Sequence, residues 1–506
     1  MSDLLATHAS THPDKPAIID DRLGVDIVTL TFAELDRRAN QLAAVLLSLG
    51  ARPGTKVLTW GQNSAALIVA THALRRVGAV TVPLNYRLAS EEAAYVIDNS
   101  DASIVYVDAE YTGALDEIRT DVPKVADVLV FDGDGELEAR MDAASSGPPD
   151  IDVAAPPATM IYTSGTTGRP KGAVRSSAID PGQVGGLLSL IGYVPDDVYL
   201  TTGPLYHSGP GGFAAIAHAL GNTIVVQHRF EPEDWLRLVQ AYVVTTTFTA
   251  PTPIRMITAL PDEVKDRYDR SSMRRLIANA APWTLALKQR YLADFPTDSL
   301  WEVYGSTELG VDTVLAPEDH LAKPGSCGKP APGIDIVLFD EEGNEVTDPG
   351  VTGELYVRSA SLFTGYHKAE QKYRDASRGD FHTVGDIAYF DDDGYLYIAD
   401  RKSDMIVSGG MNIYPAEIEA ALDASPDIEE VAVFGVDNEE WGESVHAAVV
   451  PAHVAVTAED IIDFARAHVA RYKVPRTITF VNELPKTGSG KVLKRQLRAD
   501  LSSSRP

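Results

Sequence analysis

The amino-acid sequence predicts an α/β protein with a large N-terminal layered domain and a smaller C-terminal domain. Its 506 residues exceed the size at which a single hydrophobic core keeps growing. Over the first quarter of the chain, apolar strand-like runs alternate with amphipathic helix-like stretches, which is typical of layered sheets and helices. The same alternation starts again on a smaller scale after about Asp404.

The predicted elements of the large domain are mainly strands, each followed by sequence compatible with a helix. Strands are expected at residues 56–60, 79–85, 103–108, 158–163, 223–227, 245–249 and 300–304. Residues 132–157 are acidic and rich in Gly, Pro and Ser, so a surface loop is expected there.

The C-terminal part has its own set of predicted elements. Helices are expected at residues 415–422 and 458–470, and strands at 431–436, 447–450 and 477–481. About 100 residues is a normal size for a small domain. We therefore expect one domain over residues 1–402 and a second over residues 403–506.

Composition and charge narrow the class of protein. Hydrophobic residues make up 44% of the chain and charged residues 23%, as in ordinary globular proteins. The net charge of -28 makes nucleic acids and anionic lipids poor partners. The longest nearly apolar stretch, residues 185–194, is too short for an integral membrane segment, and no secretory signal is visible. A cytoplasmic location is expected, and the single cysteine, Cys327, agrees with a reducing compartment.

The loop at residues 162–172 carries the strongest sign of chemistry. It places hydroxyl side chains, glycines and the cations Arg169 and Lys171 directly after a predicted strand. Glycines let backbone N–H groups approach a phosphate closely, and the hydroxyls and cations add donors and charge. A flexible turn is the alternative interpretation. The loop is not the P-loop of NTPases, because Pro170 precedes Lys171 and Gly172 stands where Ser or Thr is required.

The 162–172 loop resembles the phosphate-loop signature of the adenylate-forming (AMP-binding) superfamily, which includes acyl-CoA synthetases, luciferases and peptide-synthetase adenylation domains. Further motifs follow in that family's order over nearly the whole chain. They lie at residues 204–207, 304–308, 353–355, 383–386, 400–404, 408–415 and 485–491. The resemblance implies the fold of these enzymes, with a mobile α+β C-terminal domain.

The implied reaction is that of an AMP-forming, fatty-acid-CoA ligase-like enzyme. A carboxylic acid and ATP would give acyl-AMP and pyrophosphate, and coenzyme A would then take the acyl group and release AMP. Two anions meet in the first step, so preorganised positive charge and donors lower its barrier most. The acid is already ionised near neutral pH, so no general base is needed.

The resemblance assigns roles to the catalytic and metal-binding residues. Lys491 would lie between the carboxylate and the α-phosphate, and Thr307 would donate a hydrogen bond to that phosphate. Glu308 would help to hold Mg²⁺, a hard ion that prefers oxygen ligands, with Thr163 as a weaker second ligand. His207 would border the acyl pocket and the entry of the thiol.

The remaining ATP contacts are implied in the same way. Tyr304 would stack on adenine, Asp386 would accept from the ribose hydroxyls, and Arg401 would bind ribose or phosphate oxygens. Further contacts are implied at Ser164, Gly165, Thr166, Thr167, Gly168, Lys171, Ala280, Ala281, Pro282, Gly305, Ser306 and Ile398.

The small domain is expected to move between two poses, one for each half-reaction. One pose would bring Lys491 to the phosphates, and the other would bring in the loop that begins at Ser408. The hinge is expected at Ser403 and Asp404, although the family usually has Asp or Lys where Ser403 stands. Coenzyme A contacts are expected at Ser408, Gly409, Gly410 and Trp441.

The positions that match the family's acyl pocket are mostly small or apolar. They are Tyr206, Ser208, Gly209, Gly212, Phe248, Leu309 and Val311. Small side chains leave volume, so a fatty, aromatic or bulky hydrophobic acid is the expected substrate. Two alternatives stay open: an acyl-AMP ligase that loads a carrier protein in trans, and a non-catalytic sensor of nucleotide or acyl-adenylate. A homodimer is one option for the oligomeric state.

Overall fold

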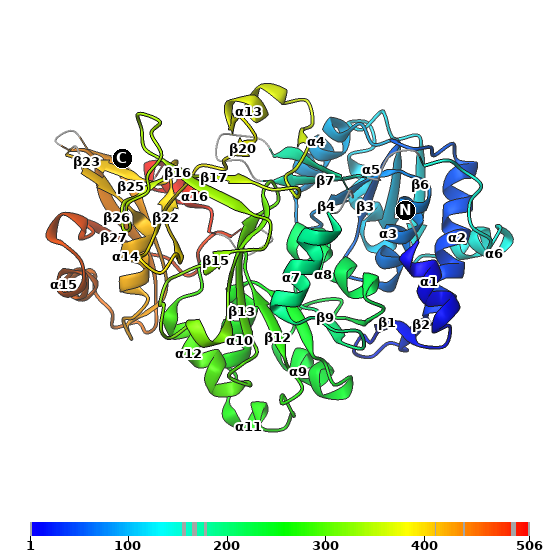
Figure 1. Ribbon diagram of the computed structural model, residues 1–506, viewed down its shortest axis with the longest axis horizontal. Coiled ribbons are helices and arrows are strands. Elements are labelled where there is room, and N and C mark those ends of the chain that lie inside the picture. Colours follow the sequence, from blue (N-terminus) through cyan, green and yellow to red (C-terminus); the bar gives the residue numbers. More distant parts are fainter. Residues whose placement is uncertain are drawn as a thin grey trace.

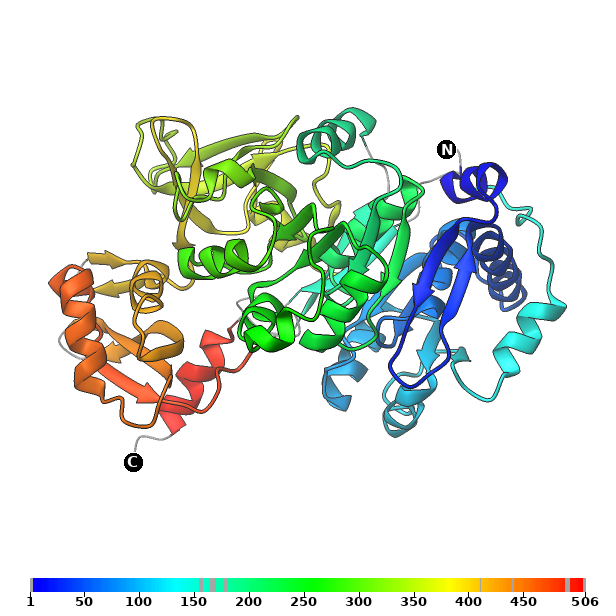
Figure 2. The same ribbon diagram turned by 90° about the horizontal axis from the view of Figure 1, so that it is seen from below.

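The structure is a computed structural model that describes residues 3–153, 158–163, 170–176, 180–409, 411–438, 441–486 and 492–503. Within these residues the strands form four sheets flanked by helices (Figure 1). Seen from below, the C-terminal elements lie at one end of the molecule and the N-terminal elements at the other (Figure 2). The α/β fold class with a smaller C-terminal part is therefore confirmed.

The first sheet has nine strands in the order β15-β14-β13-β12-β11-β9-β10-β1-β2. Neighbours from β13 to β1 run parallel, and the outer pairs run antiparallel. Its strands are β1 (Pro16–Asp20), β2 (Val28–Thr31), β9 (Val198–Thr201), β10 (Thr223–Val226), β11 (Thr246–Thr249), β12 (Arg275–Ala278), β13 (Leu300–Ser306), β14 (Gly310–Leu315) and β15 (Lys329–Pro330).

The second sheet has seven strands in the order β18-β8-β7-β4-β3-β5-β6. β6, β5, β3, β4 and β7 run parallel, and β8 returns antiparallel to β7. The predicted phosphate loop is thus the connection between β7 and β8. The strands are β3 (Lys56–Trp60), β4 (Val80–Leu84), β5 (Ile104–Asp108), β6 (Asp127–Phe131), β7 (Ala158–Thr163), β8 (Lys171–Ser176) and β18 (Gly365–Tyr366).

Helices cover both sheets, and local sequence explains several of their ends. The N-terminus of α2 carries a capping box, in which Thr31 and Glu34 satisfy each other's backbone N–H groups. The helices are α1 (Leu4–Thr11), α2 (Phe32–Ser48), α3 (Ala65–Arg76), α4 (Ser90–Ser100), α5 (Thr112–Glu117), α6 (Glu136–Ala143), α7 (Pro181–Ile191), α8 (Ser208–Ala219), α9 (Pro232–Ala241), α10 (Pro251–Thr258), α11 (Asp262–Lys265), α12 (Leu285–Asp294) and α13 (Glu370–Asp375).

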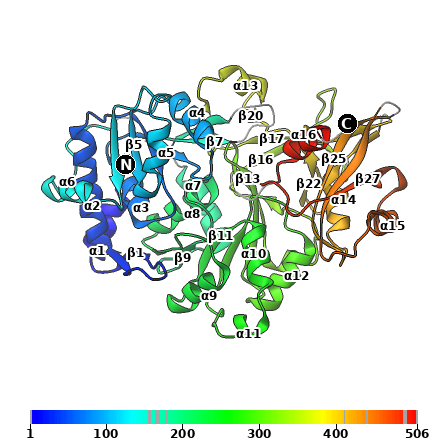
Figure 3. The same cartoon turned by 180° about the vertical axis from the view of Figure 1, so that it is seen from behind.

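Helix α8 is the element that most affects the site. It begins with Ser-Gly-Pro-Gly-Gly, a poor helix-forming sequence because glycine loses much backbone entropy in a helix. Tertiary packing holds it instead, since Phe213, Ala214, Ala217 and His218 are buried. Figures 1 and 3 both show α8 beside α7 at the centre of the molecule.

A third, antiparallel sheet follows and leads into the C-terminal part. It contains β16 (Asp335–Phe339), β17 (Gly353–Arg358), β19 (Ser377–Arg378), β20 (Phe381–His382), β21 (Asp386–Phe390) and β22 (Leu396–Arg401). The fourth sheet contains β23 (Ile406–Ser408), β24 (Met411–Ile413), β25 (Ile428–Asn438), β26 (Gly442–Pro451) and β27 (Thr477–Phe480), with helices α14 (Pro415–Leu422), α15 (Ala458–His468) and α16 (Lys494–Ser503).

The fourth sheet has separate hydrophobic clusters of its own, which include Ile413, Leu422 and Val433. The expected boundary at residues 402 and 403 falls in the turn between β22 and β23. The division into two domains there stays our proposal.

Most predicted elements match the structure, and one does not. The strands expected at 56–60 and 158–163 coincide with β3 and β7, and the helix expected at 415–422 coincides with α14. The loop expected at 132–157 was wrong in part, because it contains α6. Leu137 and Met141 are four residues apart and bury the same face of α6. In the part of the chain that is described, no helix is both long and apolar enough to cross a membrane.

Candidate active site

A cavity of about 2600 Å³ lies where the parallel strands of the first two sheets end. The last residue or the residue just after β7, β12 and β13 borders it, as do residues of α7 and α8. Ligands of open α/β sheets bind in crevices at the carboxyl ends of strands, and a cavity at this place is therefore the candidate active site.

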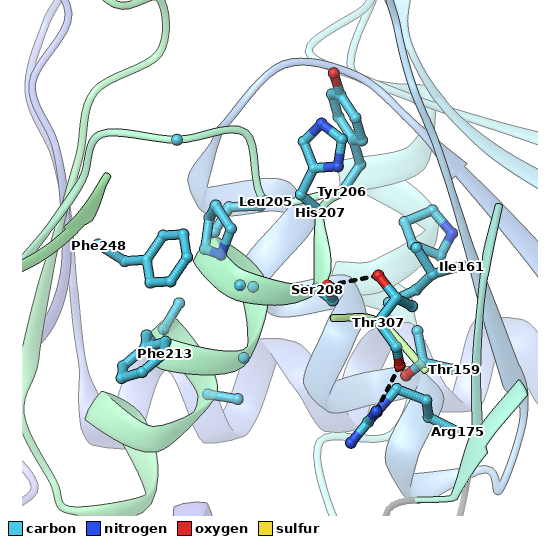
Figure 4. A pocket seen from close by; sticks show the side chains of 18 of the residues that line it. Thr159, Ile161, Arg175, Leu205, Tyr206, His207, Ser208, Phe213, Phe248 and Thr307 are labelled. Carbon is cyan, nitrogen blue, oxygen red and sulfur yellow. Dashed lines mark hydrogen bonds between the residues drawn. The ribbon is translucent and has the colours of Figure 1, made fainter. Parts of the chain in front are cut away.

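The turn at Thr307 and Glu308 lies at the centre of this cavity. Thr163, the last residue of β7, donates a hydrogen bond of 3.1 Å from Oγ1 to Glu308 Oε1. The Tyr366 hydroxyl donates to the same oxygen at 3.0 Å. Ser208 Oγ at the start of α8 shares a hydrogen bond of 2.8 Å with Thr307 Oγ1 (Figure 4). The structure thus brings the predicted catalytic pair against both Thr163 and the acyl pocket.

Arg175 on β8 supports this turn from below in Figure 4. Its guanidinium donates 2.5 Å and 2.7 Å hydrogen bonds to the backbone carbonyls of Thr307 and Ser361. Burial lowers the pKa of Arg175 and the nearby Glu308 carboxylate opposes that shift. A half-buried guanidinium that bridges two carbonyls holds both chain segments in one arrangement.

Two lysines supply positive charge beside Glu308. Lys171, predicted from the phosphate loop, begins β8 and lies close to Lys372 on α13. Burial and the neighbouring Lys171 ammonium lower the pKa of Lys372. Two cations held together against mutual repulsion, in a protein of net charge -28, form a local site suited to a polyanion such as triphosphate.

The predicted nucleoside contacts form a second group. Tyr304 donates a 2.5 Å hydrogen bond from its hydroxyl to Asp386 Oδ2, and Arg401 Nε lies 3.2 Å from Asp386 Oδ1. Burial, followed by the charge of Asp386, raises the pKa of the Tyr304 hydroxyl. Ala280 has a φ of 75°, a left-handed backbone conformation that residues other than glycine rarely adopt. Such local strain is common at ligand sites.

The rest of the predicted ATP contacts lie in or near the same region. Gly305, Ser306 and Ala280 line the cavity. Among the described residues that line it, Ala281, Pro282 and Ile398 do not occur. A side chain at Gly305 would place its Cβ 1.9 Å from the carbonyl oxygen of Gly310, so glycine is required there. Ile398 packs against the large hydrophobic core three residues before Arg401.

The predicted acyl pocket is an aromatic and glycine-lined part of the cavity (Figure 4). The rings of Phe213 and Phe248 stack with centroids 5.1 Å apart. A Cβ at Gly209 would lie 2.3 Å from Phe248 Cζ, whereas one at Gly212 would meet nothing within 4 Å. Gly209 therefore lets the aromatic ring approach α8, and Gly212 leaves empty space.

Other expected pocket residues differ in position. Tyr206 and His207 both line the cavity, with ring centroids 4.3 Å apart, and Val311 lines it as well. Leu309 is fully buried in the large core and is not part of the described lining.

The C-terminal part contributes two groups of predicted residues. Gly409 donates a backbone hydrogen bond of 2.8 Å to the Trp441 carbonyl, and a Cβ at Gly409 would lie 2.7 Å from the indole ring. The expected coenzyme A residues Ser408, Gly409 and Trp441 are therefore adjacent. The expected hinge residues Ser403 and Asp404 form the turn that follows β22. Lys486, from the C-terminal part, lines the cavity.

Several predicted residues lie outside the described part of the chain. They are Ser164, Gly165, Thr166, Thr167, Gly168, Gly410 and Lys491. Lys486 and Val492 form a β-bridge, and Lys486 and Leu493 line the cavity, so the described residues on either side of 487–491 face it.

Sequence reasoning missed four residues that the structure places at the site: Arg175, Tyr366, Lys372 and Asp312. Both carboxylate oxygens of Asp312 are buried and make no hydrogen bond within the described residues. Burial and the charge of Asp386 raise its pKa well above the ordinary value. One signal was available for Arg175: it follows Lys171 by four residues on a strand, so both side chains point to the same face. The sequence carries no comparable signal for the other three.

This fold, in which Thr163 contacts the Thr307–Glu308 turn beside an apolar pocket, fits an enzyme that uses a nucleotide to activate a second small molecule. The family model described as "AMP-binding enzyme" matches residues 5–367, and that described as "AMP-binding enzyme C-terminal domain" matches residues 417–491. The chain belongs to the AMP-binding enzyme family and is an AMP-forming acid–thiol ligase. The family predicted from the sequence motifs is confirmed.

Known relatives span almost the whole chain. A feruloyl-CoA synthase of an Amycolatopsis species is 35% identical over 476 residues, 93% of each chain. The long-chain-fatty-acid–CoA ligase FadD13 of Mycobacterium tuberculosis is 30% identical over 505 residues, 99% of each. Among solved structures, ATP-bound MatB from Rhodopseudomonas palustris has a TM-score of 0.86 at 29% identity, covering 98% of both chains.

Proposed function

We propose that this chain joins a bulky hydrophobic carboxylic acid to coenzyme A through an acyl-adenylate. The observation that carries the proposal is the Thr307–Glu308 turn, which is held between Thr163 at the phosphate side and Ser208 at the apolar pocket. A carboxylate in the pocket would therefore meet the α-phosphate of ATP beside Thr307. This arrangement supplies proximity and orientation for the attack.

The residues around the turn have separate roles in this proposal. Lys171 and Lys372 bind the phosphates and offset the charge of the leaving pyrophosphate. Asp386 accepts hydrogen bonds from the ribose, and Arg401 keeps its carboxylate in place. Glu308 fits a magnesium ion, because it is a hard oxygen ligand whose Oε1 is already oriented by two hydroxyl donors. Mg²⁺ bound there would neutralise developing charge on the phosphates.

The second half-reaction uses the C-terminal part. The small domain, residues 403–506, turns about Ser403 and Asp404. This rotation removes Lys491 from the active site and brings the Ser408–Gly409 segment into it. The adjacency of Ser408, Gly409 and Trp441 supports a coenzyme A contact there, and Arg476, whose guanidinium lies over the Trp441 ring, adds positive charge beside it. The pose in the structure suits the first half-reaction, since Lys486 and Leu493 line the cavity.

The aromatic pocket favours a large acyl group. Phe213 and Phe248 form its wall, and Gly212 of α8 leaves volume that acetate would not fill. The two relatives described above are named for a feruloyl and a long-chain fatty acid substrate, and both are large acids.

The test is release of pyrophosphate with Mg²⁺ and ATP across short, medium, long, aromatic and polycyclic acids, with and without coenzyme A. Release with one class of large acid, together with formation of AMP and a thioester, is the expected result. Adenylate that coenzyme A never consumes would favour a carrier protein as the acceptor. If no acid in the panel causes release of pyrophosphate while the protein still binds ATP, the non-catalytic sensor would be favoured.

A further inference from the structure

The cavity does not end at the aromatic pocket but follows α8 along its whole length. Ser208, Gly212, Ala215 and Ala219 recur at intervals of four, three and four residues, so they share one face of the helix, and all line the cavity. The side chains on this face are small or absent, and Gly212, Ala215 and Ala219 are exposed. The cavity therefore extends from Thr307 along this face to the C-terminal end of α8, and we call this stretch the acyl channel.

The length of this channel follows from helix geometry. Ser208 shares a hydrogen bond with Thr307, and His218 lies ten residues further along α8. Ten residues of α-helix span about 15 Å, which matches an extended acyl chain of about twelve carbons. An acid activated at Thr307 would thus place its tail near His218.

A half-buried histidine, His72, and a buried one, His218, lie at the far end of the channel. His72 on α3 and His218 on α8 both line the cavity, and His72 Nε2 lies 2.9 Å from His218 Nδ1. His218 Nε2 lies 3.0 Å from the backbone carbonyl oxygen of Ala17. Burial lowers the pKa of both rings, that of His218 to about 4, so both are neutral at pH 7.

The hydrogen bonds settle which nitrogen carries each proton. A carbonyl only accepts, so His218 Nε2 is the donor to Ala17. The neutral His218 then has an unprotonated Nδ1, which accepts a hydrogen bond from the N–H of His72 Nε2. A neutral ring has one N–H, so His72 Nδ1 is a bare acceptor, and it makes no hydrogen bond within the described residues.

We propose that the far end of the acyl channel binds a hydroxyl group on the tail of the substrate, with His72 Nδ1 as the acceptor. This inference rests on the proposed function and narrows it to long or bulky acids that carry a hydroxyl about 15 Å from the carboxylate. A tail without a hydroxyl would displace water from His72 Nδ1 and leave this nitrogen without a hydrogen-bond donor. Sites of this kind discriminate strongly against analogues that lack the hydroxyl.

The experiment compares kcat/KM for pyrophosphate release with two matched pairs of acids. 12-Hydroxydodecanoic and dodecanoic acid reach the far end, whereas 6-hydroxyhexanoic and hexanoic acid do not. The expected preference for the hydroxy acid is at least tenfold in the long pair and within twofold in the short pair. His72→Phe keeps a ring but removes the acceptor, and it should bring the preference in the long pair to within twofold.

A second variant tests the path of the tail without touching the histidines. Ala215→Leu places a bulky side chain midway along the channel and should lower kcat/KM for both twelve-carbon acids at least tenfold relative to the six-carbon acids. Pyrophosphate release without preference for 12-hydroxydodecanoic acid overturns this inference alone. The absence of release with every acid tested overturns the proposed function, and this inference with it.

Discussion

Arg175 and Thr307 are 132 residues apart in the sequence, yet the guanidinium of one donates a 2.5 Å hydrogen bond to the backbone carbonyl of the other. A second bond from the same group reaches the carbonyl of Ser361. The turn that carries Thr307 and Glu308 is thereby tied to β8, the strand that follows the phosphate loop. Support of this kind keeps reacting groups within the small tolerance that catalysis requires.

Replacement of Arg175 tests this support. Arg175→Met should lower kcat for ATP–pyrophosphate exchange about 10- to 100-fold, because hydrogen bonds from a charged donor are worth about 1.5–3 kcal/mol. Arg175→Lys keeps the charge but cannot bridge both carbonyls, so it should recover only part of the activity. Arg358→Met is the matched control, since Arg358 forms an exposed ion pair with Asp335. Equal loss in the control would refute a positioning role.

Tyr366→Phe tests the orientation of Glu308. The change removes the hydroxyl that donates to Oε1 at 3.0 Å and leaves Thr163 as the other donor described at that oxygen. We expect the apparent KM for MgATP to rise about 10- to 100-fold, in line with one lost hydrogen bond to a charged group, worth about 1.5–3 kcal/mol. Tyr373→Phe on α13 is the control. A KM that depends on Tyr373 and not on Tyr366 would contradict the assignment of Glu308.

Gly209→Ala tests the contact between α8 and the aromatic wall. The new Cβ would lie 2.3 Å from Phe248 Cζ, so the ring has to move into the pocket. We expect kcat/KM for the preferred large acid to fall at least tenfold, and Phe248→Leu in the same chain to restore part of it. Gly113→Ala, at a helical glycine with open space around it, serves as control. Additive losses in the double variant would show that the two positions do not interact.

Lys491→Ala separates the two half-reactions. It should abolish formation of acyl-adenylate, because the flanking residues Lys486 and Leu493 face the cavity in this pose. Thioester formation from supplied acyl-adenylate and coenzyme A should keep most of its rate, because in our proposal another pose serves that step. Lys329→Ala, at an edge strand of the first sheet, is a control. Equal loss of both half-reactions in Lys491→Ala would refute the two-pose assignment.

The pH dependence of stability should carry a contribution from His382. Burial lowers the pKa of this ring to about 4, whereas the unfolded chain has an ordinary value near 6.5. Between these pH values the unfolded state binds a proton that the folded state does not. The contribution of His382 to the free energy of unfolding is therefore fully present above pH 6.5 and is lost as the pH falls toward 4. The loss should reach about 2 kcal/mol between pH 7 and pH 5.

Chemical denaturation of wild type and His382→Phe at both pH values measures this contribution. The phenylalanine ring fits the stack that His382 makes with Phe363 and Tyr373, so the variant should show a smaller fall in unfolding free energy between the two pH values. His12→Phe, at an exposed histidine, should leave the fall as in wild type. An identical fall in all three proteins would rule out His382 as a contributor.

Much of the fold was predictable because it depends on short-range patterns. β3, β7 and α14 appeared in the sequence as apolar runs or helical periodicity with clear ends. Helix α6 was missed because the acidic, Gly- and Pro-rich sequence around it outweighed its two buried residues, Leu137 and Met141. Helix α8 had an equally weak signal, since it begins with glycines and is held by packing.

The sequence by itself determined the family, the order of its motifs and the presence of both a phosphate-loop motif and a Thr–Glu motif. These features are runs of neighbouring residues, and their chemistry depends on which groups stand side by side in the chain. Only the tertiary structure decided that Arg175 and Tyr366 support that turn, and that His72 meets His218 at the end of α8. Those contacts depend on which strands and helices become neighbours, and periodicity shows which face of an element is buried but not what it is buried against.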